Sequence, residues 1–159
     1  RDRVDDDDGQ RIYTCLSHDI VVHEATHALL DGIRPSYLNP SSPDQAGFHE
    51  GFADVIALLS VFHHSEIIEH ALRPLRDAAG RIPAARLSVE SLGGTALGRL
   101  AEEMGSALEG VRGAALRHSV TIEPNRRHYT SARFAEEHDR GELLVAIIIR
   151  AFVDIWVRR

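Results

Sequence analysis

Two histidines and a glutamate near the start of the chain have the spacing of a hydrolytic metal site. The residues His23, Glu24 and His27 form an HExxH motif. Residues four apart lie one turn apart on the same helix face, so both imidazoles could bind one Zn²⁺. Glu24 is turned by about 100° from His23 around the helix axis. This offset suits Glu24 to activate a zinc-bound water as a base, and not to be a ligand.

The motif alone has limited specificity, because a chain of this composition contains it by chance at a frequency of about 0.05. Its setting adds weight, since the surrounding helix residues are mostly apolar. Burying two histidines and a glutamate costs several kcal/mol unless they are paired or bound to a metal. The plainer alternative is a pair of core histidines with satisfied hydrogen bonds.

A catalytic zinc ion needs a third protein ligand and an open fourth position. A metzincin would place a histidine six residues after His27 and a glycine three residues before that histidine, but Ile33 and Leu30 occupy these positions. Glu50 and Asp54 lie four apart on one face of the next predicted helix. We expect Glu50 to be the third ligand and Asp54 to accept the second ring N–H of a zinc histidine.

His49 is the natural competitor of Glu50 for the metal. It is adjacent to Glu50 and therefore points about 100° away on a helix, so the two cannot share a face. We interpret His49 as a partly exposed or loop-bonded histidine.

Periodicity, capping residues and breakers predict a mostly helical chain. A helix from Ser17 to Leu30 has a nearly all-round apolar surface, which predicts a central, buried position. The other predicted elements are a strand at 11–16, helices at 43–63 and 65–78, a softer helical region at 88–118, a loop at 121–132 and a buried helix at 141–157.

We therefore predict a mainly α, zincin-like helical core with at most a short strand near the N-terminus. Residues 1–10 contain four consecutive aspartates and are predicted to be a flexible acidic tail. Residues 11–159 are predicted to form one catalytic domain, which could be part of a longer chain.

Composition restricts the partners and the compartment. The net charge is -6, which argues against nucleic acid because phosphate binding needs a basic face. No apolar run reaches the roughly 18 residues of a membrane span. One cysteine excludes an intrachain disulfide, and the first ten residues contain no signal-peptide core. We expect a cytoplasmic protein. The sequence does not indicate its oligomeric state.

The segments HEATHALLDG and FHEGFADVIAL resemble the gluzincin metallopeptidases, whose best-known branch is thermolysin-like. The amino-acid sequence of these two segments is closer to an uncharacterised bacterial branch than to thermolysin itself. The resemblance covers residues 11–63 and implies a zinc endopeptidase acting on a peptide or protein. It assigns the metal ligands to His23, His27 and Glu50, the base to Glu24 and the supporting carboxylate to Asp54.

Gluzincins also carry a late histidine that donates a hydrogen bond to the tetrahedral oxyanion. His138 stands just before the last predicted helix and fits this role better than His118 or His128. Arg140 could orient substrate carbonyls or pair with an acid. Tyr37 lies between the two metal helices, where a second oxyanion donor is expected, although packing is the preferred role.

Two other classes of protein compete with the peptidase. The first is a zinc-binding structural or regulatory domain that does not cleave peptides, against which the intact Glu24 argues. The second is a helical bundle without metal. A departure from the family is that only 22 residues precede His23, whereas thermolysin-like enzymes have a large sheet domain there.

Overall fold

The fold is mainly α-helical, which confirms the predicted class. The computed structural model describes residues 3–5, 11–13, 18–87, 119 and 122–158. Four α-helices carry this part of the chain: α1 His18–Ile33, α2 Pro43–Val61, α3 Ser65–Leu72 and α7 Glu137–Val157. Short 3-10 turns connect them: η2 Pro35–Leu38, η3 Arg73–Leu75, η4 Ala84–Arg86, η6 Arg126–Thr130 and η7 Ala132–Phe134. The helical region expected at 88–118 lies outside the described residues.

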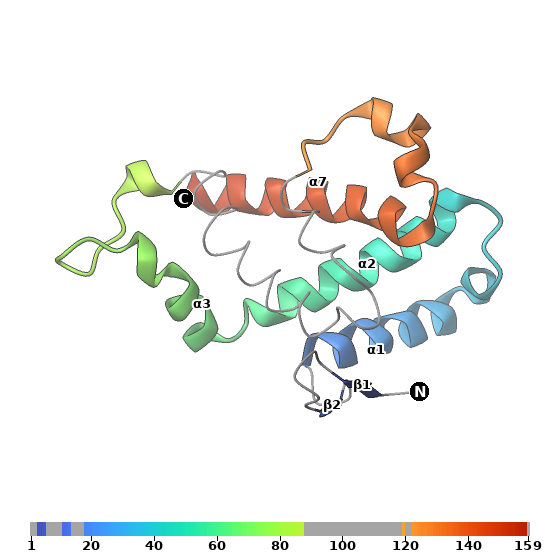
Figure 1. The fold of residues 1–159 in the computed structure, drawn as a ribbon, viewed down its shortest axis with the longest axis horizontal. Coiled ribbons are helices and arrows are strands. Elements are labelled where there is room, and N and C mark those ends of the chain that lie inside the picture. The colour runs from blue at the N-terminus through green and yellow to red at the C-terminus, as the bar shows by residue number, and fades with distance from the viewer. Residues whose placement is uncertain (1–2, 6–10, 14–17, 88–118, 120–121, 159) are drawn as a thin grey trace.

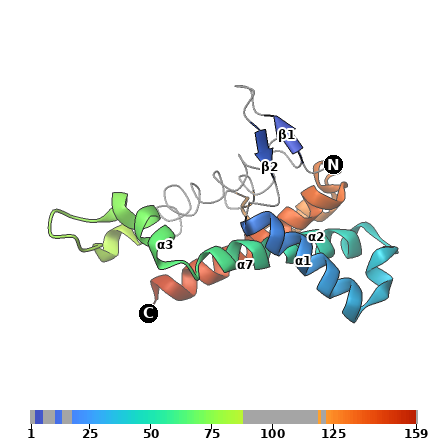
Figure 2. The ribbon, with the colours of Figure 1, turned by 90° about the horizontal axis from the view of Figure 1, so that it is seen from below.

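A small antiparallel hairpin precedes the helices. Strand β1, Arg3–Asp5, pairs with β2, Arg11–Tyr13, and lies to one side of the helices (Figure 2). The described part of the predicted strand at 11–16 is thus a strand. Its partner β1 lies within the segment predicted as an acidic tail.

Helix α2 lies between α1 and α7 and is the centre of the described structure (Figure 1). Its small and aliphatic residues pack against α7. The main core cluster consists of Val55, Ala57, Leu58, Val61, Leu72, Leu75, Val145, Ile149 and Val153. This cluster lies towards the C-terminal half of α2, whereas the buried residues of the first half are small, namely Ala46, Gly47 and Gly51.

The prediction of a central, buried first helix is wrong. In α1 only Asp19, His23 and Thr26 are buried, whereas Leu29 and Ile33 are 67% and 74% exposed. Hydrophobic residues all round a helix indicate burial, but which element is central depends on the number of its neighbours. Here α2 has helices on two sides and α1 packs mainly on one.

Local signals explain most helix ends. The side chain of Ser42 accepts a hydrogen bond from the backbone N–H of Gln45 and caps α2, with Pro43 at the first helical position. Helix α1 continues through Gly32 to Ile33, and Pro35 then begins the turn η2. Pro74 ends the third helix by placing residues 73–75 in a 3-10 turn.

Three glycines allow α2 and α7 to come into backbone contact. A Cβ atom on Gly51 would lie 2.5 Å from the carbonyl oxygen of Gly141, and one on Gly141 would lie 2.8 Å from the amide nitrogen of Gly51. A Cβ on Gly47 would meet the side chain of Arg140 at 2.5 Å. Any larger residue would push the helices apart. The glycines therefore set the distance between Glu50, beside Gly51, and the first turn of α7.

An arginine fixes the start of α7 on the start of α2. Arg140 donates from Nε to Oδ1 of Asp44 over 2.7 Å and from Nη1 to the carbonyl oxygen of Tyr129 over 2.8 Å. Its guanidinium also stacks on the Tyr129 ring at 4.9 Å. Of the two roles considered for Arg140, the structure therefore shows pairing with an acid. Because Arg140 follows His138 by two residues, this contact also positions His138.

Helix α7 begins at Glu137, four residues before the predicted start at Gly141. The reason is that Glu136 caps the N-terminus of this helix, which the sequence pattern did not predict. The carboxylate of Glu136 accepts hydrogen bonds from the backbone N–H groups of His138 and Asp139, at 2.9 and 3.2 Å. His138 therefore lies in the first turn of the helix and not in a preceding loop.

Among the described residues, no single helix is long and apolar enough to cross a membrane.

Candidate metal centre

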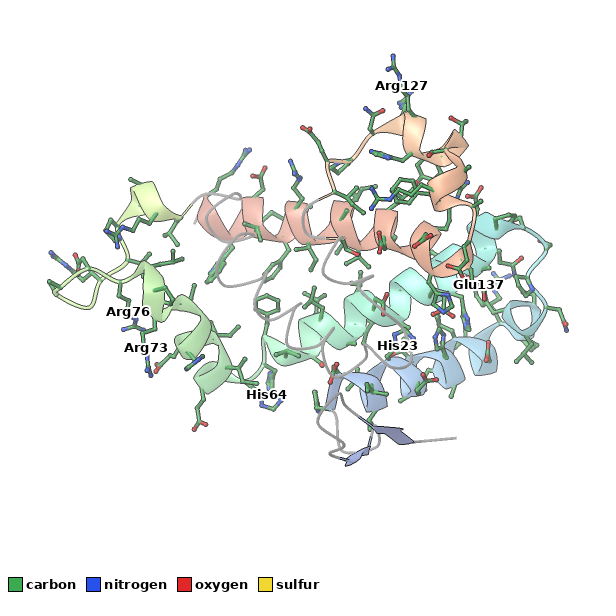
Figure 3. The ribbon with its side chains drawn as sticks, in the orientation of Figure 1. His23, His64, Arg73, Arg76, Arg127 and Glu137 are labelled. Carbon is green, nitrogen blue, oxygen red and sulfur yellow. The ribbon has the colours of Figure 1, made fainter. Side chains whose placement is uncertain are left out.

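The predicted ligands meet between α1 and α2. His23 points from α1 towards α2 (Figure 3), and the side chains of His27 from α1 and Glu50 from α2 meet it there. Oε2 of Glu50 lies 3.6 Å from Nε2 of His23 and 3.5 Å from Nε2 of His27, and the two Nε2 atoms are 2.8 Å apart. All three ligand atoms lie within 4.8 Å of one another. Two imidazoles and one carboxylate thus converge on one point.

These separations fit a tetrahedral zinc ion closely. Zn–N and Zn–O bonds of about 2.0–2.1 Å place neighbouring tetrahedral ligands about 3.3 Å apart. The two distances to Glu50 are close to this value, and the two histidine nitrogens need to separate by about half an ångström. A His₂Glu set also leaves a fourth position open, as a catalytic zinc ion requires.

The carboxylate of Asp54 holds the first histidine from behind. Its Oδ1 lies 2.8 Å from Nδ1 of His23. The ring nitrogen Nδ1 therefore carries the proton and Nε2 presents its lone pair to the centre, which is the tautomer that a metal needs. His23 is only 5% exposed, so this contact also satisfies a polar atom that water cannot reach easily. The position of Asp54 next to the second ring nitrogen of His23 is the one that the sequence predicted.

Glu24 follows His23 on α1 and has an exposed side chain. The helix turns it away from the face that packs on α2, as the 100° offset requires. The three candidate ligands are thus turned inward, whereas the carboxylate of Glu24 is turned towards solvent.

His138 reaches the same centre from a third helix. Its Nε2 lies 3.5 Å from Oε2 of Glu50, and its Nδ1 lies 2.6 Å from Oε1 of Glu136. Glu136 therefore both caps α7 and orients the His138 ring. Burial acts to raise the pKa of Glu136, but hydrogen bonds from the His138 side chain and the Asp139 amide, with the charge of His138, lower it overall.

Two polar features near the centre were not predicted. His49 makes a close contact with Asp31 of α1, and Glu142 lies buried one turn after His138 at 3% exposure. Burial raises the pKa of Glu142 to about 8; the charges of Asp139 and Asp54 add to this effect and that of Arg133 opposes it. The one sequence signal for this position is the spacing of four residues between His138 and Glu142, which places both side chains on the same face of α7.

The remaining candidate residues lie elsewhere. Tyr37 stacks on Phe48 and His49, with ring centroids 5.9 and 5.3 Å away, in agreement with a packing role. His128 packs edge-on against Phe134 at 4.9 Å. His118 lies outside the described residues. Three histidines at the end of α2 and on α3 are exposed at the surface, namely His63, His64 and His70.

Comparison with models of protein families, with curated proteins and with solved structures gave no match to this chain.

Proposed function

We propose that this protein is a zinc-dependent metallopeptidase of the gluzincin type that hydrolyses peptide bonds in a peptide or protein substrate. The observation that carries the proposal is the convergence of three helices on one centre. Helix α1 supplies His23 and His27, α2 supplies Glu50 with Asp54 behind it, and α7 supplies His138. A structural zinc site is closed by four protein ligands, whereas this donor set has three within the part of the chain that the structure describes.

A zinc ion held by His23, His27 and Glu50 would supply a Lewis acid and would lower the pKa of water towards about 7. Glu24 takes the proton from the attacking water and passes it to the leaving amine as general base and then general acid. Its exposed position leaves room for the peptide.

His138 acts on the charge that develops on the carbonyl oxygen. Its Nδ1–H donates to Glu136, so a hydrogen bond to the oxyanion requires a second proton, on Nε2. The protonated ring is therefore the active form. A donor preorganised in this way stabilises the transition state more than the ground state.

The test compares the wild type with Glu24→Gln, measuring zinc content and cleavage of fluorescently labelled casein. We expect equal zinc content and a fall in cleavage rate of at least about 100-fold, the usual size of a general-base contribution. The matched control is Glu69→Gln, an exposed acid on α3, which should leave both values unchanged.

Cleavage that is unaffected in Glu24→Gln would contradict the role of Glu24. A wild type that binds zinc and cleaves neither casein nor a peptide library would favour the non-proteolytic zinc domain. A wild type that binds no zinc would contradict both zinc-binding proposals and would favour the metal-free helical bundle.

A further inference from the structure

The two histidines of the centre are held differently. His23 has Asp54 at 2.8 Å behind its Nδ1. His27 is partly buried, and no hydrogen-bond partner meets its Nδ1 among the described residues. A metal-binding imidazole almost always has a second group that fixes the orientation of its ring. The structure must therefore hold the His27 ring by other contacts.

A stack of three rings supplies these contacts. The ring of His49 lies 4.3 Å from that of His27, tilted by 40°, and the ring of Tyr37 lies 5.3 Å from that of His49 at an angle of 12°. His49 thus contacts both other rings and is the middle ring of the three. Offset aromatic contacts of this kind are worth about 0.5–1.5 kcal/mol beyond the area that they bury.

Asp31 anchors the middle ring. Nε2 of His49 lies 3.1 Å from Oδ1 of Asp31, with angles outside those of a hydrogen bond, so the contact is electrostatic. Asp31 follows His27 by one turn of α1, and His49 precedes Glu50 on α2. The contact therefore joins the two ligand-bearing helices one helical turn beyond His27, at the opposite end of the ligand row from the contact between His23 and Asp54.

We infer that His49 and Asp31 form a second histidine–carboxylate pair that positions His27 for metal binding, with His49 as the positioning residue. This inference rests on the proposed metal centre. His49 packs on the ring of His27, but its nitrogens are not among the ligand atoms that converge with those of His23 and Glu50, so it acts through the ring of His27 and not as a ligand. The stack restricts rotation of the His27 ring, and Asp31 restricts movement of the His49 ring that packs on it.

The test uses zinc affinity and the visible spectrum of the cobalt-substituted protein, whose bands report ligand geometry. His49→Ala should raise the Kd for zinc by about 10–100-fold and change the cobalt bands. His49→Phe restores the middle ring and should recover most of the affinity and the wild-type bands. The control His70→Ala, an exposed histidine on α3, should match the wild type.

A second variant keeps the test decisive if His49→Ala does not fold. Asp31→Leu removes the anchor without touching a ring, and it should shift the cobalt bands in the same direction. Combined with His49→Ala in a folded protein, it should add little, because the two residues act as one unit. Wild-type affinity and bands in either folded single variant would overturn the inference. Failure of the proposed metal centre differs, since the wild type itself would then bind neither zinc nor cobalt.

Discussion

Nε2 of His138 on α7 lies 3.5 Å from Oε2 of Glu50 on α2. This contact joins the last helix to α1 and α2, the pair of helices that carries the candidate metal ligands. It depends on the backbone approach at Gly51 and Gly141 and on the ion pair between Arg140 and Asp44. The centre is therefore a product of helix packing as much as of the HExxH motif, and substitutions in the packing should affect it.

Asp54 should strengthen metal binding without touching the metal. Asp54→Asn removes the charge behind Nδ1 of His23 and lets an amide N–H face the ring N–H. We expect the Kd for zinc to rise by about 10–100-fold, the usual effect of losing such a partner. Isothermal titration with zinc measures it, and Asp154→Asn, an exposed acid on α7, is the control. Equal affinities in the two variants would show that Asp54 is not a supporting group.

His138 should contribute to the rate and not to metal retention. His138→Ala should lower kcat for casein cleavage by about 100–1000-fold, the usual loss for one oxyanion donor, with wild-type zinc content. Glu136→Gln should lower kcat in the same direction, because it removes the carboxylate that orients the ring. Steady-state kinetics beside His70→Ala measures both effects. A wild-type kcat in His138→Ala would remove this residue from the mechanism.

The buried Glu142 should make the metal-free protein less stable as the pH rises. Burial raises its pKa to about 8 in the folded protein, against about 4.5 for a glutamate that is fully exposed to water. Between these pH values the folded protein retains a proton that the unfolded chain has released. The free energy of unfolding should therefore fall with increasing pH, by up to about 1.4 kcal/mol per pH unit from this group.

Urea unfolding at pH 5 and pH 8 in the presence of a chelator measures this slope. Glu142→Gln should flatten it, whereas Glu137→Gln, an exposed acid in the same helix, should retain it. The same slope in all three proteins would contradict a titration of Glu142 in this window.

Gly51 should be intolerant of even one methyl group. Gly51→Ala places a Cβ 2.5 Å from the carbonyl oxygen of Gly141, and separating the helices should cost about 1–3 kcal/mol of unfolding free energy. It should also weaken zinc binding, because Glu50 moves with the helix. Gly32→Ala is the control, since nothing lies within 4 Å of its Cβ, and it should stabilise α1 by up to about 1 kcal/mol. Urea unfolding that ranks Gly51→Ala with Gly32→Ala would be inconsistent with this packing.

Local sequence patterns predicted the parts of the centre that lie within one helix. The spacing of four places His23 with His27, and Glu50 with Asp54, on single faces, whatever the helices pack against. The structure brings His23, His27 and Glu50 together as the motif implied. The predicted position of Asp54 behind a metal histidine also agrees, because one turn of α2 spans the distance from ligand to supporting group.

Contacts between distant segments were beyond these patterns. The side chains of Asp31 and His49 meet only because α1 and α2 pack in one particular register. In the sequence, Gly51 and Gly141 resemble ordinary helix-breaking residues. Only the structure shows that they allow the backbones of α2 and α7 to come into contact. The burial predicted for α1 was wrong for a related reason, since its apolar residues do not show on which side a neighbour lies.

Zinc X-ray absorption on the protein loaded with one equivalent of zinc reads the ligands of the proposed centre directly. We expect about two imidazole nitrogens and two oxygens at about 2.0–2.1 Å, from His23, His27, Glu50 and a solvent molecule. In His27→Phe one imidazole should be lost from this shell. An oxygen-only shell in the wild type, or an unchanged imidazole count in His27→Phe, would contradict a metal centre at HExxH and Glu50.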